Sequence, residues 1–390
     1  MSAKRVILLR SNPVAPDPPV EKAADTLLSQ GYQVTIVGWD RDSTTHEQVS
    51  TLALQRGNAK MVRFGIPAIF DGGLKKNLLP LLRFQKQLFT WLKLHRDEYD
   101  VIHAFDFDTG LIANNIATRY KKILIYHILD FYVASHALPM GWLKETVRKA
   151  EYRIIHKADC TILCTEKRKE QIAGSHPKKL EIIHNTPKQS NITCETIIRN
   201  SAKERCRIVY VGILAGSRFI RELIQFVKSD ERFELHIGGF GLMEEEILRA
   251  SQACERVVFY GKLPYEKTIA LETSCDVMTA IYDPAVPNHR YAAPNKFYES
   301  LMLGKPVIMA KNTGFDEIIT ENKIGCLIDY TQDGLANGLN KLYEQRDNWV
   351  AMGKKMQELY HNKYSWAEME KRLIALYDGL DDEKDTDCKQ

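Results

Sequence analysis

The sequence lacks the features that mark several protein classes. Its eight cysteines include no C-x-x-C pair, and the closest two, Cys160 and Cys164, are separated by three residues. This spacing fits neither a zinc site nor a disulfide-rich domain, so we expect free thiols in a reducing cytosol. No apolar run approaches the ~20 residues of a membrane-spanning helix, and Val6–Leu9 is too short for the core of a secretory signal. The sequence therefore predicts a cytoplasmic protein.

A strong excess of charge is also missing. The formal net charge is +4 over 390 residues, which is too weakly basic to indicate a nucleic-acid-binding protein. The composition, 44% hydrophobic and 27% charged, is that of an ordinary globular protein. A chain of this length is longer than one hydrophobic core usually supports, and it is long enough for two domains.

Short apolar runs alternate with amphipathic segments along both halves of the chain. Strands that alternate with helices form parallel sheets covered on both faces, so each half predicts one α/β domain. The expected strands are Arg5–Leu9, Gln33–Val37, Met61–Phe64, Val101–Ala104, Ile123–His127, Thr161–Cys164 and Ile182–Asn185 in the first half, and Arg207–Val211, Glu234–Ile237, Val257–Tyr260, Asp276–Ile281, Pro306–Met309 and Cys326–Ile328 in the second.

These patterns predict the domain boundaries. Residues 1–186 form a first Rossmann-like domain, and the polar residues 187–204 form a linker. Residues 205–364 form a second Rossmann-like domain, and a helix over 365–380 packs back on the first. The charged residues 381–390 are expected to form a disordered tail.

Pro294–Ile308 is the segment that says most about function. Its proline opens a helix, Gly304 ends it, and a buried strand follows. Lys296 and Glu299 are three residues apart and share one face of the first turn, where free N–H groups and the helix dipole attract anions. The lysine can meet a diphosphate, and the glutamate can accept hydrogen bonds from a ribose diol. The alternative is a solvated Lys–Glu pair at an ordinary helix start.

Two glycine-containing turns follow earlier strands of the same half. Gly212 ends one strand, and Arg218 and Arg221 follow it at a spacing that could clamp a phosphate. Gly239 and Gly241 end the next strand, without the third glycine of a dinucleotide fingerprint. Each turn alone is equally compatible with a plain strand-to-helix connection. Because ligands collect beyond the carboxyl ends of strands in open α/β sheets, the coincidence of the three turns indicates a binding site.

Taken together, these segments resemble the retaining glycosyltransferases of the GT-B fold, in particular family four. The resemblance covers most of the chain, and it is carried by Ile208–Gly212, Leu235–Gly241, Phe259–Leu263 and Pro294–Ile308, with Tyr99–Ala104, Ala158–Ile162 and Ile183–Asn185 upstream. It implies two Rossmann-like domains with an interdomain cleft. The first domain would lie on the acceptor side, and the second would bind a nucleotide-diphosphate sugar.

The resemblance also implies roles for residues. In that family, the glutamate matching Glu299 holds the donor ribose, a basic pair after the first strand of the second domain holds the diphosphate, and a loop like Tyr260–Lys262 lies beside the base. Tyr291 and Ile213 depart from the family, which usually has a glutamate and an arginine there. The expected donor contacts are Gly212, Arg218, Arg221, Gly239, Gly241, Tyr260, Gly261, Lys262, Asn295, Lys296 and Glu299.

His127 and Asp130 are the catalytic candidates of the first half. They stand at the end of an expected strand, which the resemblance turns toward the donor sugar, where a polar group could bind a hydroxyl or stabilise developing charge. His103 occupies a similar position. A histidine satisfied within the core is the competing interpretation of both.

Asp106-Phe107-Asp108 forms a D-x-D pair that could hold a divalent cation on a diphosphate. The pair precedes a helix, however, and Asp108 is a good helix N-cap residue. We favour the cap, and we expect neither a metal ion nor another cofactor.

Leu74–Arg96 holds six basic residues and no acidic one, interleaved with leucines and with Phe84, Phe89 and Trp91. Pro80 should limit the helix at its start. This composition is typical of a segment that contacts anionic lipid, and it is equally typical of a domain helix with a solvated basic face.

The expected function is hexosyl transfer from a nucleotide-diphosphate sugar to an acceptor glycan or lipid-linked sugar. We expect retention of anomeric configuration, no metal requirement, and a role in surface polysaccharide or glycolipid synthesis. The enzyme would act in the cytoplasm or as a peripheral protein at the inner face of the membrane. The alternatives are a nucleotide-sugar 2-epimerase of the same fold and a non-catalytic glycosyltransferase-like subunit.

Overall fold

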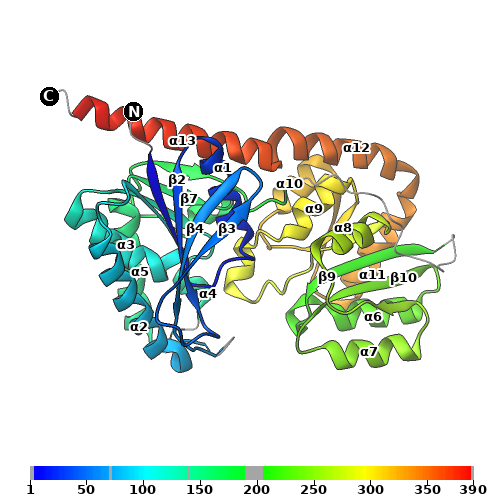
Figure 1. Cartoon of the computed structure of the whole chain (residues 1–390). Coiled ribbons are helices and arrows are strands. Elements are labelled where there is room, and N and C mark those ends of the chain that lie inside the picture. Colours follow the sequence, from blue (N-terminus) through cyan, green and yellow to red (C-terminus); the bar gives the residue numbers. More distant parts are fainter. Residues whose placement is uncertain (1–3, 70–72, 137, 139, 189–204, 388–390) are drawn as a thin grey trace. The chain divides into compact units, whose positions relative to one another are not determined.

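The computed structural model describes residues 4–69, 73–136, 138, 140–188 and 205–387, which fall into two compact units (Figure 1). Unit 1 comprises Met1–His184 with Met369–Gln390, and unit 2 comprises Asn185–Glu368. Helix α13 (Trp366–Asp387) therefore begins in unit 2 and ends in unit 1. Of the expected linker, residues 189–204 lie outside the described residues.

Unit 1 is built on an eight-stranded sheet of order β3-β4-β2-β1-β5-β6-β7-β8, in which only the β3–β4 pair is antiparallel. The strand order reverses at β1, and ligands of open α/β sheets bind at such a switch point. The strands are β1 (Arg5–Leu9), β2 (Gln33–Asp40), β3 (Gln48–Leu54), β4 (Gly57–Gly65), β5 (Val101–Phe105), β6 (Ile123–Ile128), β7 (Cys160–Leu163) and β8 (Leu180–Ile182), and the helices besides α13 are α1 (Pro18–Ser29), α2 (Gly73–Leu94), α3 (Asp106–Tyr120), α4 (Tyr132–Ser135) and α5 (Gly141–Lys157).

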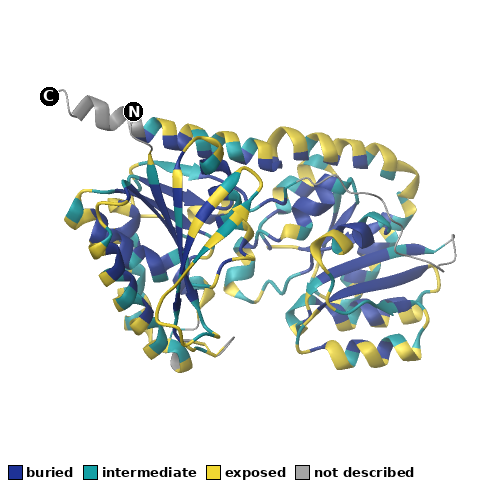
Figure 2. Ribbon diagram, in the orientation of Figure 1, coloured by how far each residue is buried: buried dark blue, intermediate teal, exposed yellow. Residues whose placement is uncertain are grey.

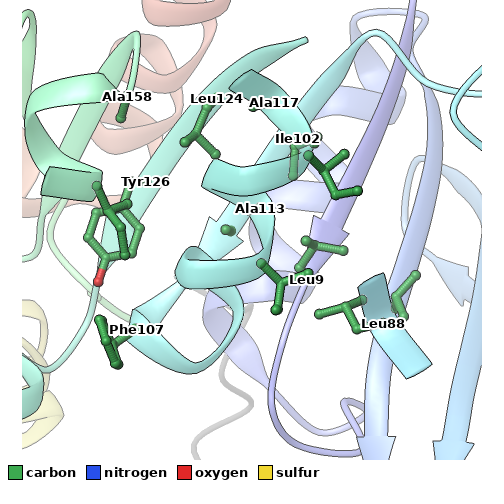
Figure 3. Close-up of a cluster of buried hydrophobic side chains, with 14 of the residues drawn as sticks. Leu9, Leu88, Ile102, Phe107, Ala113, Ala117, Leu124, Tyr126 and Ala158 are labelled. Atoms are coloured by element: carbon green, nitrogen blue, oxygen red, sulfur yellow. The ribbon is translucent and has the colours of Figure 1, made fainter. Parts of the chain in front are cut away.

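The main core of unit 1 lies between its sheet and helices α2, α3 and α5 (Figure 3). Ile102, Leu124 and Tyr126 of the strands meet Leu88 of α2 and Ala113 of α3 in this layer. Helix α3 approaches the sheet closely because it carries Gly110. A Cβ atom at that position would lie 2.5 Å from the Tyr126 ring.

Unit 2 contains a six-stranded sheet of order β11-β10-β9-β12-β13-β14, and all its neighbouring strands are parallel. The order reverses at β9, which is the switch point of this unit. The strands are β9 (Cys206–Ile213), β10 (Phe233–Phe240), β11 (Val257–Phe259), β12 (Val277–Thr279), β13 (Val307–Ala310) and β14 (Gly325–Ile328), and the helices are α6 (Ile220–Ser229), α7 (Glu244–Ala253), α8 (Tyr265–Thr273), α9 (Asn295–Leu303), α10 (Asp316–Asn322), α11 (Gln332–Glu344) and α12 (Trp349–Leu359).

The fold class predicted from the sequence, two Rossmann-like α/β domains, is confirmed, and each expected strand overlaps an observed one. The sequence did not reveal β3, because this edge strand has no buried residue and so no continuous apolar pattern. Two further expectations are wrong. Pro80 lies inside α2 instead of limiting its start. Residues 381–387, expected to be disordered, continue α13, since neither glycine nor proline stops the helix after Gly379.

Helix α2 also corrects the expected lipid-contacting surface. Phe84 and Trp91 are buried in the core of unit 1, and Phe89 packs against it, so these aromatic rings cannot insert into a membrane. The residues exposed near the start of α2 form a smaller surface. Buried and exposed residues alternate along this helix (Figure 2). We call this surface the α2 patch, which consists of Lys76, Leu78, Leu79, Leu82, Arg83 and Lys86.

Within the described part of the chain, six cysteines are present and all are free; Cys194 and Cys388 lie outside it. None of the described helices combines the length and the apolar character that crossing a bilayer requires.

Candidate functional site

The carboxyl ends of β9 and β10 bring the two predicted glycine turns of unit 2 together. Gly212 and Gly239 are register partners at this edge of the sheet, and both have positive φ angles, 152° and 136°. A Cβ atom on Gly239 would overlap the carbonyl oxygen of Gly212. The close approach of the two turns therefore requires glycine at position 239.

Lys296, in the first turn of α9, points its ammonium group at this edge. Its Nζ lies 4.9 Å from the centroid of the Tyr210 ring, and a Cβ atom on Gly212 would come within 2.6 Å of Nζ. The missing side chain of Gly212 thus makes room for the ammonium group. No carboxylate within 4.0 Å pairs with Lys296 in the part of the chain that the structure describes.

Arg218 is the second cation of the site. Its guanidinium lies 3.8 Å from the centroid of the Tyr282 ring, and its Nη1 donates to His289 Nε2 at 3.3 Å. His289 can accept because its Nδ1 donates to the carbonyl of Asp283 at 2.9 Å, and burial lowers the pKa of His289, which favours its neutral form. Among the described residues, Arg218 therefore rests on an aromatic ring and a neutral imidazole, with no ion pair to an acidic side chain.

Arg221 does not form the expected clamp with Arg218. Arg218 belongs to a short turn, whereas α6 begins only at Ile220, and Phe219 between them has a positive φ of 60°. The two arginines thus do not share a helix face at i and i+3. Arg221 instead makes a bidentate, surface-exposed ion pair with Glu246, with both distances 2.7 Å.

Glu299 is buried one turn after Lys296. Burial raises the pKa of Glu299 to about 7, while the Lys296 charge and a hydrogen bond from Tyr265 oppose this rise. Glu272 of α8, only 1% exposed, shares the cluster, and its Oε2 has no hydrogen-bond partner among the described residues. Burial, and then the Glu299 charge, raise the pKa of Glu272 well above its ordinary value. Glu272 could not be predicted from the sequence, because it stands 27 positions before Glu299 and belongs to no motif.

The remaining donor candidates line the same strand edge. The carbonyl of Gly261 accepts from Gly239 N at 2.7 Å, and the Tyr260 hydroxyl lies 2.9 Å from His236 Nδ1. Lys262 is exposed, with its ammonium 5.0 Å from the Phe240 ring centroid.

Gly241 and Asn295 complete the candidate set. A Cβ atom on Gly241 would lie 2.6 Å from the carbonyl oxygen of Leu214, so this turn also needs glycine. Asn295 is exposed at the first position of α9, and no side chain caps that helix. Within this first turn the N–H of Phe297 donates to the carbonyl of Pro294 at 3.0 Å, which leaves the N–H groups of Asn295 and Lys296 available to an anion.

The matching edge of unit 1 is arranged differently. Arg10, which follows β1, forms ion pairs with Asp17, at 2.7 Å, and with Asp106. The other oxygen of Asp106 accepts from the backbone N–H groups of Leu129 and Asp130, at 2.8 and 3.1 Å. Both oxygens of Asp106 are therefore in use.

The D-x-D pair does not act as expected at the start of α3. The favoured N-cap role of Asp108 is wrong, because α3 begins at Asp106 and its N-cap residue, Phe105, makes no side-chain cap. Asp106 adopts a left-handed conformation, φ 61°, in which its side chain turns to Arg10 and the loop after β6. The same contacts take Asp106 away from a divalent cation, because both of its carboxylate oxygens already have partners. No cluster of potential metal ligands occurs among the residues that the structure describes.

The two catalytic candidates lie at the end of β6 in unlike surroundings. His127 is buried, and its Nδ1 is 3.2 Å from Nε2 of His103. Burial lowers the pKa of His127 well below its ordinary value, so the imidazole is neutral. Asp130 is largely exposed and forms an ion pair with buried Arg168 at 3.0 Å.

Comparison with known proteins identifies both halves of the chain. Residues 20–186 match the family model described as Glycosyltransferase Family 4, and residues 195–366 match the model described as Glycosyl transferases group 1. A search of curated proteins gave no significant match.

Solved structures share the fold along nearly the whole chain. Sucrose-phosphate synthase from Thermosynechococcus elongatus has a TM-score of 0.75 at 17% identity, over 97% of this chain and 99% of that one. HepE from Anabaena, solved with UDP, has a TM-score of 0.67 at 12% identity over 96% and 100% of the two chains. The catalytic domain of starch synthase IV from Arabidopsis thaliana, bound to ADP and acarbose, has 0.68 at 11% identity over 96% and 99%. From the two family models and this shared fold, we conclude that the chain is a glycosyltransferase of the GT-B fold that resembles family four.

Proposed function

We propose that this glycosyltransferase takes a hexosyl group from a nucleotide-diphosphate sugar bound by unit 2 and transfers it with retention of configuration. The observation that carries the proposal is that two cations at the switch point of unit 2 lie on aromatic rings and have no acidic partner among the described residues. These cations are Lys296, on the ring of Tyr210, and Arg218, on the ring of Tyr282. Cations held in this way are preorganised for an anion that arrives from solution.

A diphosphate leaving group fits these cations. As the bond to the sugar breaks, negative charge grows on the diphosphate, and Lys296, Arg218 and the uncapped start of α9 would stabilise it. Ionised Glu299 would accept hydrogen bonds from the ribose hydroxyls. The two fixed cations supply the charge that a divalent ion provides in other transferases, so we propose a reaction without a metal requirement. HepE from Anabaena has been solved with UDP-glucose, which makes this donor the first to test.

The α2 patch supports an acceptor at a membrane surface. Leu78, Leu79 and Leu82 are 47%, 59% and 51% exposed on unit 1, next to the exposed basic residues of the same patch. Exposed leucines beside basic side chains favour the boundary of an anionic bilayer. We therefore propose a peripheral protein at the inner face of the membrane that extends a lipid-linked or surface glycan.

Incubation with UDP-glucose alone tests the proposed reaction, because water replaces the missing acceptor. Release of UDP with α-glucose as the first-formed anomer, insensitive to EDTA, is the expected result. First-formed β-glucose would contradict retention, and loss of activity in EDTA with recovery in manganese would contradict metal independence. Interconversion of two nucleotide sugars would indicate the epimerase. Tight UDP binding with neither reaction would indicate a non-catalytic subunit.

A further inference from the structure

Three side chains form a hydrogen-bonded chain on the face of the unit 1 sheet opposite its main core. The hydroxyl of Tyr377, on α13, lies 2.9 Å from Nδ1 of His103 on β5. The other nitrogen of His103, Nε2, lies 3.2 Å from Nδ1 of His127 on β6. This series of hydrogen bonds ends at His127, because its Nε2 has no partner among the described residues.

The imidazole rings of His103 and His127 are held in place by Phe105. Residues two apart on a strand share one face, and the His103 and Phe105 rings stack with their centroids 4.6 Å apart and their planes 6° apart. Phe105 also stacks on His127, its register partner on β6, at 4.8 Å. Phe105 therefore fixes both imidazole planes.

All three polar side chains are uncharged. Burial lowers the pKa of His103 to about 3 and the pKa of His127 well below its ordinary value. Burial also raises the pKa of the Tyr377 hydroxyl well above its ordinary value. Each neutral imidazole carries one N–H and one lone pair, so the direction of one hydrogen bond determines the direction of the next.

The Tyr377 hydroxyl sets that direction. Its proton has no acceptor other than His103 Nδ1 in the described part of the chain, and a buried hydroxyl that fails to donate loses free energy. If Tyr377 donates to Nδ1, His103 carries its proton on Nε2 and donates to His127 Nδ1. The proton of His127 must then be on Nε2, the nitrogen without a protein partner. The reverse direction would leave the buried Tyr377 proton unpaired.

We propose that Tyr377 and His103 hold His127 in the tautomer that carries its proton on Nε2, so that His127 serves glycosyl transfer as a hydrogen-bond donor to a sugar hydroxyl. Tyr377 and His103 are positioning residues, and His127 is the group that contacts substrate. This role rests on the proposed function. It makes His127 a donor that orients the sugar, whereas a general base or a partner for developing positive charge would need the lone pair that Nε2 lacks. It also gives the C-terminal helix a part in the chemistry of unit 1.

The tautomer can be measured without any substrate. In protein with ¹⁵N-labelled histidine, long-range ¹H–¹⁵N spectra distinguish protonated from unprotonated ring nitrogens, and His127→Gln assigns the signal. We expect a protonated Nε2 and an unprotonated Nδ1 for His127 at neutral pH. A proton on Nδ1 of His127 overturns the proposal, whether or not UDP-glucose is hydrolysed.

Variants test whether the chain of hydrogen bonds matters to the reaction. Tyr377→Phe removes one hydroxyl and should mix the His127 tautomers and slow UDP-glucose hydrolysis about three- to tenfold, the worth of one neutral hydrogen bond. Tyr152→Phe, which removes a hydroxyl bonded to backbone carbonyls elsewhere in unit 1, should leave both unchanged. Unchanged tautomer and rate in Tyr377→Phe would overturn the proposal.

His127 itself separates a donor from an acceptor. Glutamine can place an N–H near the position of Nε2, so His127→Gln should hydrolyse UDP-glucose faster than His127→Leu. Equal loss in both variants removes the donor role. If the parent shows the expected tautomer yet neither binds nor hydrolyses UDP-glucose, the choice of donor fails while the assignment of the proton stands.

Discussion

The carboxyl edges of the two sheets both carry arginine or lysine beside the central strand, but the two units treat these charges in opposite ways. In unit 1, Arg10 is neutralised by Asp17 and Asp106. In unit 2, Lys296 and Arg218 lie against aromatic rings, with no acidic partner within ion-pair distance among the described residues. A neutralised arginine braces loops, whereas a cation on a ring keeps its charge for a ligand. The same position in the same kind of fold is therefore structural in one unit and a binding position in the other.

The largest effect should come from unit 1. Arg10→Met leaves the carboxylates of Asp17 and Asp106 without their cation, and breaking such a buried pair costs about 3–5 kcal/mol. Chemical unfolding should show this loss of stability, while UDP affinity at a temperature where the variant is folded should not change. Arg148→Met, which removes a solvent-exposed pair with Glu145 in the same unit, should hardly change the stability, because solvent screens that pair. Equal losses would show that Arg10 is no brace.

Lys296 should behave in the opposite way. Lys296→Met should slow UDP-glucose hydrolysis by about 10²–10³, because it removes a preorganised positive charge from the leaving group. The fold should tolerate the change, because Lys296 has no acidic partner within 4.0 Å among the described residues and buried Glu299 can take up a proton when the nearby charge is lost. Lys355→Met, an exposed lysine of α12 in the same unit, is the matched control. A Lys296 variant that unfolds like Arg10→Met would remove the contrast between the units.

Glu299 should give a smaller effect that depends on pH. A charged hydrogen bond contributes roughly 1.5–3 kcal/mol, so Glu299→Gln should bind UDP about ten- to a hundredfold more weakly at pH 8. Burial raises the pKa of Glu299 to about 7, so the carboxyl is ionised above that pH and protonated below it. Because the ribose needs the ionised form, parent affinity should fall about tenfold between pH 8 and pH 6.

Isothermal titration calorimetry of parent and Glu299→Gln across this pH range isolates the contribution of the carboxyl. Any pH dependence left in the variant comes from the phosphate or from other groups. A parent and variant with the same pH profile would show that Glu299 does not hold the ribose.

The smallest effect should come from the α2 patch. Each basic residue near an anionic surface is worth about 1 kcal/mol, so Arg83→Gln should weaken binding to anionic vesicles about fivefold. Lys169→Gln, at another exposed lysine of unit 1, should not. Flotation with neutral and anionic vesicles at low and high salt measures this, because salt screens the attraction. Equal flotation on both lipids, or none, would remove the membrane proposal.

Much of this contrast could be predicted from the sequence, and what could not be predicted has a physical reason. Local spacing predicted the two sheets and placed Gly212, Lys296 and Glu299 at one edge, because parallel strands end together. It could not show that Gly212 makes room for Lys296, since that contact joins turns 84 positions apart.

Other features depend on tertiary packing. Glu272 lies in an unremarkable helix until α8 and α9 bury it beside Glu299. The expected Arg218–Arg221 pair assumed one continuous helix, which Phe219 interrupts. Trp91 looked available to lipid because amphipathic helices that face a core and those that face a membrane share one periodicity.

The most direct test of the central claim is a thermal-shift panel of nucleoside diphosphates on the parent protein and Lys296→Met. A ligand that binds only the folded state stabilises it by about 2.7 kcal/mol at a concentration of 100 Kd. We predict that at least one nucleoside diphosphate raises the melting temperature of the parent by several degrees, that the corresponding nucleoside does not, and that Lys296→Met loses most of the shift. Equal shifts in parent and variant, or equal shifts with nucleoside and nucleoside diphosphate, would contradict the assignment of a diphosphate site to the unpaired cations of unit 2.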